Sequence, residues 1–239
     1  LIPTKEGLRL HREFRQHQAG FHRALKEISQ GRVPVSGLLT IGAYLEFAKT
    51  HLSQVIKNFI EEFPDVQIKM VFDSPSRMQQ AISRAQLDLC FSIYPSKEKS
   101  VSSEKVFQEE LVLIAPKKFP PGYLNYESIM KMPMIDYYLN HQPIRRWLHL
   151  HFQTSPKKIP LRIFAATAEM VLSLVLEGAG IGVVPYYLVQ LPEMQKKLTI
   201  VRPTTKKLTD HIWVLEKRSA EQSSLHRAFK EQMLMHFGG

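Results

Sequence analysis

The sequence predicts an α/β fold, because segments with strand and helix patterns alternate along most of the chain. Two strand-helix-strand units follow one another between residues 38 and 93, and successive units of this kind imply parallel strands joined by right-handed crossovers. With 239 residues, of which 44% are hydrophobic, the chain is long enough to bury one large core or two moderate ones.

Residues 1–30 have the pattern of one long helix whose apolar side chains lie on one stripe and whose opposite face is basic. Part of this stripe repeats every seven residues, which is typical of a coiled-coil seam. The stripe could also pack against the chain's own body, but we expect it to pair with a partner helix. The expected dimerisation residues are Leu10, Phe14, Phe21, Leu25 and Ile28.

The first strand-helix-strand unit follows a break at residues 31–37. A short apolar strand at 38–41 leads into an amphipathic helix whose apolar face runs from Ala48 to Phe63. Pro64 ends this helix, because the residue before a proline is pushed out of the helical region. Residues 66–72 then alternate between apolar and polar, as in a half-buried strand.

The second unit begins with Ser74 and Pro75, a pair that suits the N-cap and first position of a helix. This helix is followed by a strand at 87–93. The same alternation continues to the end of the chain. Further helices are expected at 126–130, 143–152 and 225–235, and further strands at 106–115, 134–137, 161–165, 198–201 and 211–215.

A glycine-rich run between Thr167 and Pro185 has the order helix, glycine corner, strand. Thr167 can cap the helix, and Gly178 or Gly180 can supply the left-handed turn that ends it. A dinucleotide-binding fingerprint has the opposite order, with the glycines before a helix N-terminus. We therefore interpret these glycines as structural.

No motif of a known catalytic site is present. The sequence lacks a Gly-x-Ser-x-Gly elbow, a P-loop and a Cys-x-x-Cys pair. His149 and His151 are two residues apart on an expected helix, so they point in different directions, unlike the i, i+4 pair of a helical zinc site. Asp88 lies within a strand and suits a capping or loop-fixing role better than general-base work. We expect no enzyme, no metal and no cofactor.

Composition and charge narrow the class of protein further. No apolar run reaches the roughly 18 to 20 residues that span a bilayer, and the first residues lack a secretory apolar region, so we expect a cytoplasmic protein. The formal net charge of +10 fits an anionic partner, either nucleic acid or an acidic metabolite, or merely a basic cytoplasmic background, and charge alone does not choose among these. Lys and Arg are nevertheless spread over the whole chain, and most of them fit solvated surface. The single cysteine, Cys90, fits an inert core position.

Four short motifs, in this order and at these separations, resemble the co-inducer-binding part of LysR-type transcriptional regulators over essentially the whole chain. They are Thr4-Lys5-Glu6-Gly7 before the long helix, Leu39-Thr40-Ile41-Gly42, Leu87-Asp88-Leu89, and the run from Glu177 to Pro185. The bacterial family's winged helix-turn-helix is absent from this sequence.

The resemblance implies the two-lobed fold of type 2 periplasmic binding proteins, with two strands crossing between α/β lobes and a ligand in the cleft. Residues 107–115 and 212–216 would be the crossings. The implied domains are a linker helix at 1–32, a discontinuous lobe I at 36–114 and 207–239, and lobe II at 115–206.

The expected effector-binding residues lie where strands end and the following helices begin, as is usual in open α/β sheets. For the tyrosines, pocket lining and ordinary packing remain alternatives; for Thr167 and Ser74 the alternative is capping alone. The candidates are Ala43, Tyr44, Ser74, Tyr94, Tyr137, Tyr138, Thr167 and Gly182. Such an aromatic site with few fixed charges suits a small aromatic or mixed-polarity effector.

The turn after the first strand differs from that of many family members, which have Ser or Thr there. Ala43 and Tyr44 take that place here, which disfavours a carboxylate effector, although helix-terminal N–H groups would still attract an anion.

We therefore expect the ligand-sensing and oligomerisation portion of a LysR-type DNA-binding regulator. Its partners would be a small-molecule effector and further copies of itself, as a homodimer or homotetramer, with DNA contacted only through the missing N-terminal domain and no membrane involved. The alternative is a periplasmic-type solute-binding protein for transport. That protein would normally carry an export signal and would not need a basic amphipathic helix before its first strand.

Overall fold

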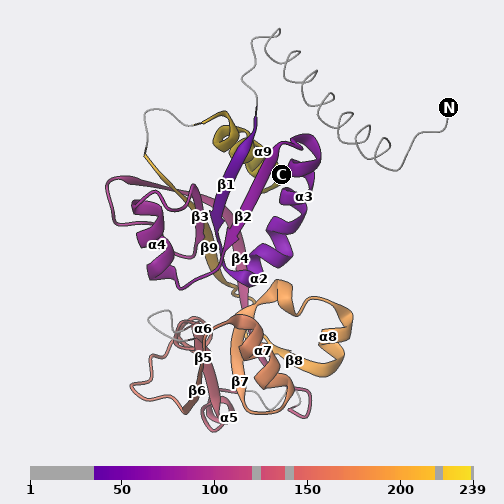
Figure 1. Cartoon of the computed structure of the whole chain (residues 1–239). Helices are drawn as coiled ribbons and strands as arrows, with labels where there is room; N and C mark the ends of the chain where they lie inside the picture. The colour runs from indigo at the N-terminus through magenta and orange to yellow at the C-terminus, as the bar shows by residue number, and fades with distance from the viewer. Residues whose placement is uncertain (1–34, 120–124, 138–142, 219–222, 238–239) are drawn as a thin grey trace, which may run out of the picture.

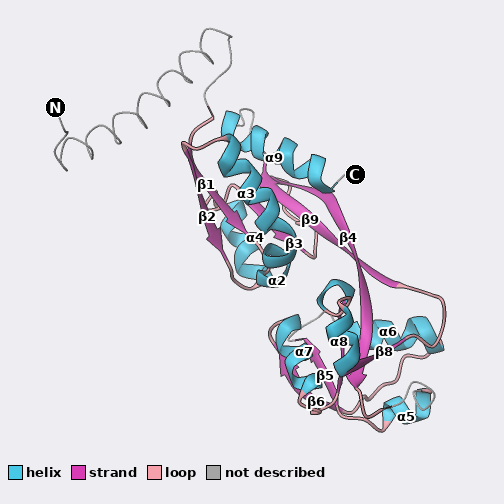
Figure 2. Cartoon of the chain, turned by 90° about the vertical axis from the view of Figure 1, so that its right-hand side faces the viewer, coloured by secondary structure: helices cyan, strands magenta, loops and turns pink. Residues whose placement is uncertain are grey.

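Two bodies of secondary structure lie at opposite ends of one long antiparallel strand pair, β4 (Val101–Pro116) and β9 (Leu208–Lys217). Figures 1 and 2 show these strands running from the upper body, here called lobe I, into the lower body, lobe II. The computed structural model describes residues 35–119, 125–137, 143–218 and 223–237. The expected helix at 1–32, with Leu10, Phe14, Phe21, Leu25 and Ile28, lies outside the described residues.

In lobe I three parallel strands pair in the order β2, β1, β3, and β9 continues the sheet antiparallel to β3. This arrangement confirms the two strand-helix-strand units expected from the sequence. The strands are β1 (Gly37–Gly42), β2 (Val66–Val71) and β3 (Leu89–Ser92), and the helical segments are α2 (Leu45–Phe47), η1 (Ala48–Leu52), α3 (Ser53–Glu62), α4 (Pro75–Ser83) and α9 (Ser224–Phe237).

The core of lobe I forms where the alternating side chains of β1 meet the apolar stripes of α3 and α9. Leu39 and Ile41 are buried on the strand, and Phe59 of α3 meets Phe229 of α9 edge to face, with ring centroids 5.1 Å apart. Burying a side chain of this size contributes roughly 1.5 to 3 kcal/mol. α9, the last helix of the chain, therefore holds the first strand and helix in place.

Asp88 fixes the loop before β3, as expected from its position in the sequence. Its Oδ2 accepts a hydrogen bond from the backbone N–H of Thr40 at 2.6 Å, and its own N–H donates to the carbonyl of Thr40 at 2.9 Å. Cys90 is buried in the lobe I core, and burial raises the pKa of its thiol to about 12. It is therefore an inert core residue at neutral pH.

Lobe II continues the same sheet in the order β9, β4, β7, β5, β6, and β8 also pairs with β4. One apolar cluster centred on Trp147 and a second containing Val171 and Val175 form its cores. The short helical segments η3 and α8 were not expected from the sequence. The elements are α5 (Tyr126–Met130), β5 (Met134–Tyr137), α6 (Pro143–Phe152), β6 (Leu161–Ala165), α7 (Ala168–Leu176), β7 (Ile181–Pro185), η3 (Tyr186–Leu188), α8 (Pro192–Lys197) and β8 (Leu198–Val201).

The glycine-rich run forms the corner between α7 and β7. The Thr167 hydroxyl accepts from the N–H of Met170 at 3.2 Å, which confirms the expected N-cap. Gly178 has a φ of +81°, a left-handed conformation that side chains rarely adopt. The structural interpretation of these glycines is therefore confirmed. None of the described helices is long and apolar enough to cross a membrane.

The candidate effector site between the lobes

The middle of the crossing strand pair carries a carboxylate between two apolar cores. On one face of β4, Phe107 packs against the lobe I core and Leu111 belongs to a lobe II core. Glu109 lies between them on the same face and is only 7% exposed. Its partner across the strand pair is Asp210 of β9, and directly opposed side chains of antiparallel strands share a face. Two acidic residues therefore lie together where the chain passes between the lobes.

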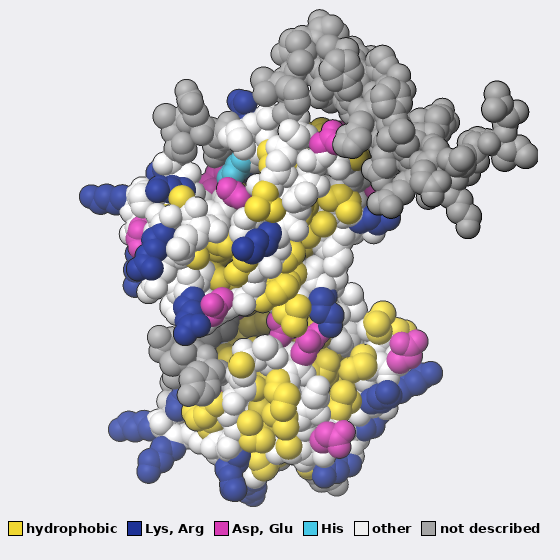
Figure 3. Space-filling view, in the orientation of Figure 1, with side chains coloured by type: hydrophobic (Ala, Val, Ile, Leu, Met, Phe, Trp, Pro, Cys, Tyr) yellow, Lys and Arg dark blue, Asp and Glu magenta, His cyan; other side chains and the backbone are white. Residues whose placement is uncertain are grey.

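Both lobes contribute residues near the Glu109 carboxylate. Glu46 of α2, also 7% exposed, comes from lobe I, while Tyr137 of β5 and Tyr187 of η3 come from lobe II. The charges of Glu46 and Glu109 both act on the two tyrosine hydroxyls, whose pKa values are raised mainly by burial. Figure 3 shows that the surface is drawn in between the two lobes.

Burial raises the pKa of Glu109 to about 8, and the nearby charges of Asp210 and Glu46 add to the rise. Within the described parts of the chain, no hydrogen bond or ion pair reaches this carboxylate. A carboxyl group in such surroundings favours its neutral form, because the charged form has lost most of its water without gaining a partner among the described residues.

Asp210, in contrast, is held by an arginine from lobe II. Arg146 of α6 donates to both carboxylate oxygens, Nη1 to Oδ2 at 3.0 Å and Nη2 to Oδ1 at 2.8 Å, and Nη2 also donates to the carbonyl of Thr209 at 3.3 Å. A two-bond pair of this kind is strong and fixes orientation. The charges of Asp210 and Arg146 also reach the hydroxyl of Tyr94, the second residue after the end of lobe I strand β3.

A second set of contacts joins the lobes at the N-terminus of α7. Lys49 of η1 forms an ion pair with Glu169 of α7 at 2.7 Å, and a Glu46 carboxylate oxygen accepts from the N–H of Glu169 at 3.4 Å. Negative charge is favoured at a helix N-terminus. The hydrogen bond is long and both charged side chains of the ion pair are solvent-accessible, so each contact is weak.

Aromatic rings make up an apolar wall beside this polar cluster. His51 of η1 lies with its ring centroid 4.4 Å from Phe107 and 4.9 Å from Tyr187, the latter edge to face. Burial lowers the pKa of His51, and His236 adds to this. Its Nε2 is buried and has no hydrogen-bond partner among the described residues. The ring therefore serves here mainly as apolar surface.

The sequence-based candidates fall into different surroundings. Tyr94 and Tyr137 lie near the polar cluster, and Thr167 lies two residues before Glu169 at the start of α7. Ala43 is fully buried in the lobe I core. Tyr44 is partly buried against that core, and its hydroxyl oxygen accepts from the N–H of Ile93 at 3.2 Å.

Of the remaining candidates, Ser74 and Gly182 lie close to neighbouring side chains of their own lobe. Ser74 occupies the N-cap position of α4 without a capping bond from its side chain, and its hydroxyl lies 3.4 Å from that of Ser76. Gly182 lies inside β7, where an added Cβ would come within 2.3 Å of Val171 of α7, so close packing of helix on strand accounts for this glycine. Tyr138 lies outside the described residues.

None of the charged residues of the cleft was predicted from the sequence. A usable signal existed for one of them: Glu109 has the same parity as the apolar Phe107 and Leu111, which places it on the inward face of its strand. The others come from segments far apart in the chain. They are Glu46, Arg146, Glu169 and Asp210, together with Tyr187. Among the described residues no group of three or more His, Cys, Asp or Glu could hold a metal ion.

Two α/β lobes, a pair of crossing strands and buried polar groups between the lobes define a two-lobed ligand-binding domain of the periplasmic-binding-protein kind. The model of the LysR substrate binding domain matches residues 33–238, and the chain belongs to this family. The resemblance to LysR-type regulators and the two-lobed fold expected from the sequence are thus confirmed, and the transport alternative is not favoured.

Curated relatives and solved structures agree with this assignment. The chain is 25% identical to the HTH-type transcriptional regulator PtxR of Pseudomonas aeruginosa over 222 residues, which cover 90% of this chain and 69% of PtxR. It spans between 58% and 70% of the length of the curated relatives that it matches.

Two solved domains have the same fold. The cofactor-binding domain of the Cbl regulator matches with a TM-score of 0.71 at 22% identity, covering 83% of this chain and 88% of that domain. The effector-binding domain of QuiR in complex with shikimate matches with a TM-score of 0.70 at 14% identity, covering 85% and 98%.

Proposed function

We propose that this chain is the effector-sensing part of a LysR-type transcriptional regulator and that a small organic molecule binds between its lobes. The observation that carries the proposal is the buried polar cluster on the crossing strands, where Glu109 and Asp210 are faced by residues of both lobes. The shikimate complex of QuiR, a protein of the same fold, supports a small organic effector.

The mechanism that fits this geometry is a population shift. β4 and β9 are the continuous connection between the lobes, and the contacts of Glu169 with Lys49 and Glu46 are weak. A ligand that binds residues of both lobes favours the lobe arrangement in which those contacts are made together, by as much as its affinity differs between arrangements.

Separate apolar cores support a division of the chain into two lobes, and the change from one core to the other falls within β4, between Val106 and Leu111. We propose lobe I at 36–114 and 207–239 and lobe II at 115–206, the bounds that the family resemblance implies. Residues 1–32 would pair as linker helices, so that homodimers or homotetramers carry DNA-binding domains supplied by a separate N-terminal segment. The chain would act in the cytoplasm and would have no enzymatic activity.

Two measurements test this function. A thermal-shift screen of the chain against small metabolites of all charge classes should identify ligands that raise its melting temperature, because a ligand that binds only the folded state stabilises it. Size-exclusion chromatography with and without residues 1–32 should show an oligomer that dissociates when they are removed. A monomer in both cases would contradict the regulator's linker helix and favour a transport-type binding protein.

A further inference from the structure

The cleft has an excess of buried acidic groups over basic ones that are free to bind a ligand. Its carboxylates are Glu46, Glu109, Glu169 and Asp210, of which Glu169 pairs with Lys49 and Asp210 with Arg146. Because Arg146 already makes two hydrogen bonds to Asp210, their charges offset each other. The carboxyl groups of Glu109 and Glu46 remain without a basic partner among the described residues.

These two carboxylates differ in what they contact. Glu46 accepts one long hydrogen bond from the start of α7, so part of its acceptor capacity is used. Glu109 is more than nine-tenths buried and no described residue donates to it. A carboxylate accepts about four hydrogen bonds when charged, so Glu109 is an acceptor group without a donor in the space where a ligand would lie.

We propose that the effector is an organic cation, a primary amine, amidine or guanidine, whose N–H groups are bound by the carboxylate of Glu109 with Glu46 beside it. This inference rests on the proposed function, since it names the ligand class for the same cleft. An ammonium or guanidinium group would give the Glu109 carboxylate a positively charged partner and N–H donors. Charge-assisted hydrogen bonds of this kind are stronger than those between neutral groups.

The aromatic residues around the carboxylates suit such a ligand. Tyr137 and Tyr187 are close enough for their hydroxyls to be influenced by both Glu46 and Glu109, and a cation is attracted to the faces of aromatic rings. The rings of His51 and Phe107 provide apolar surface for a carbon skeleton. An anion in the same place would instead meet two carboxylates and no uncommitted arginine among the described residues of the cluster.

Proton linkage gives this binding mode a distinctive signature. Glu109 must be deprotonated to bind a cation, and burial together with Asp210 and Glu46 raises its pKa to about 8. The other titratable groups facing it are Tyr137 and Tyr187, with Arg146 behind Asp210. Cation affinity should therefore rise by up to about tenfold per pH unit below that pKa and level off above it, with a proton released on binding.

The test is isothermal titration calorimetry of the whole chain with agmatine, phenethylamine and methylguanidine as cations and with shikimate and phenylacetate as anions. Titrations at about pH 6, 7, 8 and 9, each in two buffers of different ionisation enthalpy, measure both affinity and proton release. We expect the cations to bind, with affinity rising with pH, and the anions to bind more weakly or not at all.

Two variants make the test specific. Glu109→Gln should weaken cation binding by roughly tenfold or more above pH 8 and abolish its pH dependence. Glu110→Gln is the matched control, because Glu110 follows on the opposite face of β4 and pairs with Arg202 and Lys207. It should keep the affinity and pH profile of the parent chain. Thermal unfolding of each variant establishes that it is folded.

The possible outcomes separate the inference from the proposed function. Tighter binding by the anions, or cation binding that Glu109→Gln leaves unchanged in a folded protein, would overturn the organic-cation assignment while leaving effector sensing intact. If neither the cations nor the anions bind, and the wider metabolite screen also finds no ligand, both proposals fail.

Discussion

At the scale of single residues, two neighbouring glutamates of β4 show how strongly the surroundings decide the behaviour of one chemical group. Glu110 faces outward and forms ion pairs with Arg202 at 2.8 Å and Lys207 at 3.3 Å. Glu109 lies on the same face as the core residues Phe107 and Leu111, is buried and has its pKa raised to about 8. The alternation of side chains along a strand alone places these two carboxylates in opposite environments.

Glu109 should reduce stability as pH rises. Its folded-state pKa lies above its ordinary value of 4.5, so the folded protein holds a proton that the unfolded chain releases between about pH 4.5 and 8. Stability from this group is therefore greatest at low pH and is lost as pH rises through about 8. Glu109→Gln should raise the free energy of unfolding by roughly 2 to 4 kcal/mol near pH 9 and by little near pH 5.

Urea unfolding of the parent chain and the variant at both pH values measures this difference. Glu110→Gln should show no gain at high pH. A Glu109→Gln variant whose stability relative to the parent does not change with pH would contradict the assignment of a buried, unpartnered carboxyl group.

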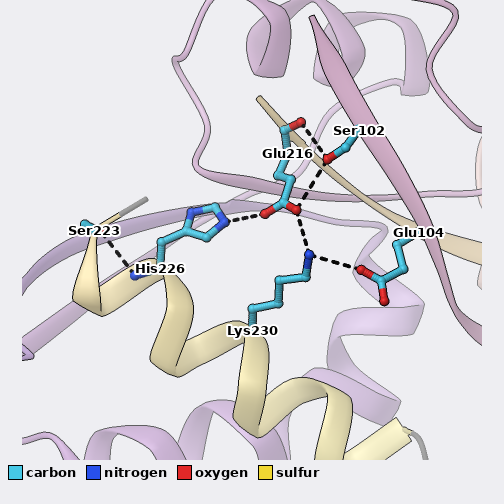
Figure 4. A network of polar contacts seen from close by, with 6 residues as sticks. All are labelled: Ser102, Glu104, Glu216, Ser223, His226 and Lys230. Carbon is cyan, nitrogen blue, oxygen red and sulfur yellow. Dashed lines mark hydrogen bonds and ion pairs between the residues drawn. The ribbon is translucent and has the colours of Figure 1, made fainter. Parts of the chain in front are cut away.

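Glu216 has the opposite behaviour because it is fully partnered (Figure 4). Its carboxylate lies 2.6 Å from both His226 Nε2 and Lys230 Nζ, and Lys230 also pairs with Glu104 at 3.0 Å. The hydrogen bond with His226, and then those with Lys230, outweigh burial and lower the pKa of Glu216 to about 2. This network ties β9 to α9 across lobe I.

The stability from Glu216 should be present above its ordinary pKa of 4.5 and should be lost as pH falls towards 2. Glu216→Gln should lower the free energy of unfolding at pH 7 by about 2 kcal/mol, a discounted figure because Glu104 and Lys230 remain partly open to water. The variant should also lose the part of the parent's pH dependence that Glu216 contributes in that acid range. Denaturant unfolding between about pH 2 and 7 measures both effects, and equal acid sensitivity of variant and parent would contradict them.

At the scale of elements, the spacing of apolar residues and the residues that mark helix boundaries predicted most of the fold. Pro64 and the Ser74-Pro75 pair mark helix boundaries, and Thr167 and the glycine corner mark both ends of α7. These signals are local, so one sequence suffices to detect them. The short helical segments η3 and α8 were not predicted, because neither produces an apolar period of its own.

Thr167 tests whether a predicted site residue acts through its helix or on a ligand. Thr167→Ala removes the hydroxyl that caps α7 and should lower the free energy of unfolding by about 1 kcal/mol. Thr167→Ser keeps the capping oxygen and should restore most of the loss. Thermal unfolding and ligand titration of both variants separate the roles. Unchanged stability together with lost affinity in Thr167→Ala would show a binding role instead of capping.

At the scale of the whole molecule, the candidate site could be predicted only in outline. Strand ends and helix starts nominated Tyr94 and Tyr137, whose hydroxyls are within reach of the charges of this cluster, and their role in effector binding stays a prediction. The cluster itself assembles Glu46, Glu109 and Tyr187, which come from a helix of lobe I, the crossing strand and a turn of lobe II. Their proximity depends on how the lobes are joined, and no local pattern in one sequence encodes it.

The contact between Lys49 and Glu169 also acts at the level of the whole molecule, because it joins the two lobes. It is an exposed ion pair at 2.7 Å, so its contribution to stability should be small. Its position is unusual, however, because it joins η1 of lobe I to α7 of lobe II, and such an energy is enough to shift an equilibrium between two lobe arrangements severalfold. The pair should therefore influence lobe closure more than it influences unfolding.

Lys49→Ala and Glu169→Ala should each increase the radius of gyration measured by small-angle X-ray scattering on ligand-free protein and weaken effector binding by roughly two- to fivefold. Glu169→Ala keeps the backbone N–H that Glu46 accepts from, so its effect isolates the ion pair. Lys57→Ala is the matched control, since Lys57 pairs with Glu61 at 2.8 Å within one helix. It should alter neither the scattering nor the affinity. If Lys49→Ala behaves like Lys57→Ala, lobe closure does not depend on this contact, and the crossing strands alone set the resting arrangement of the lobes.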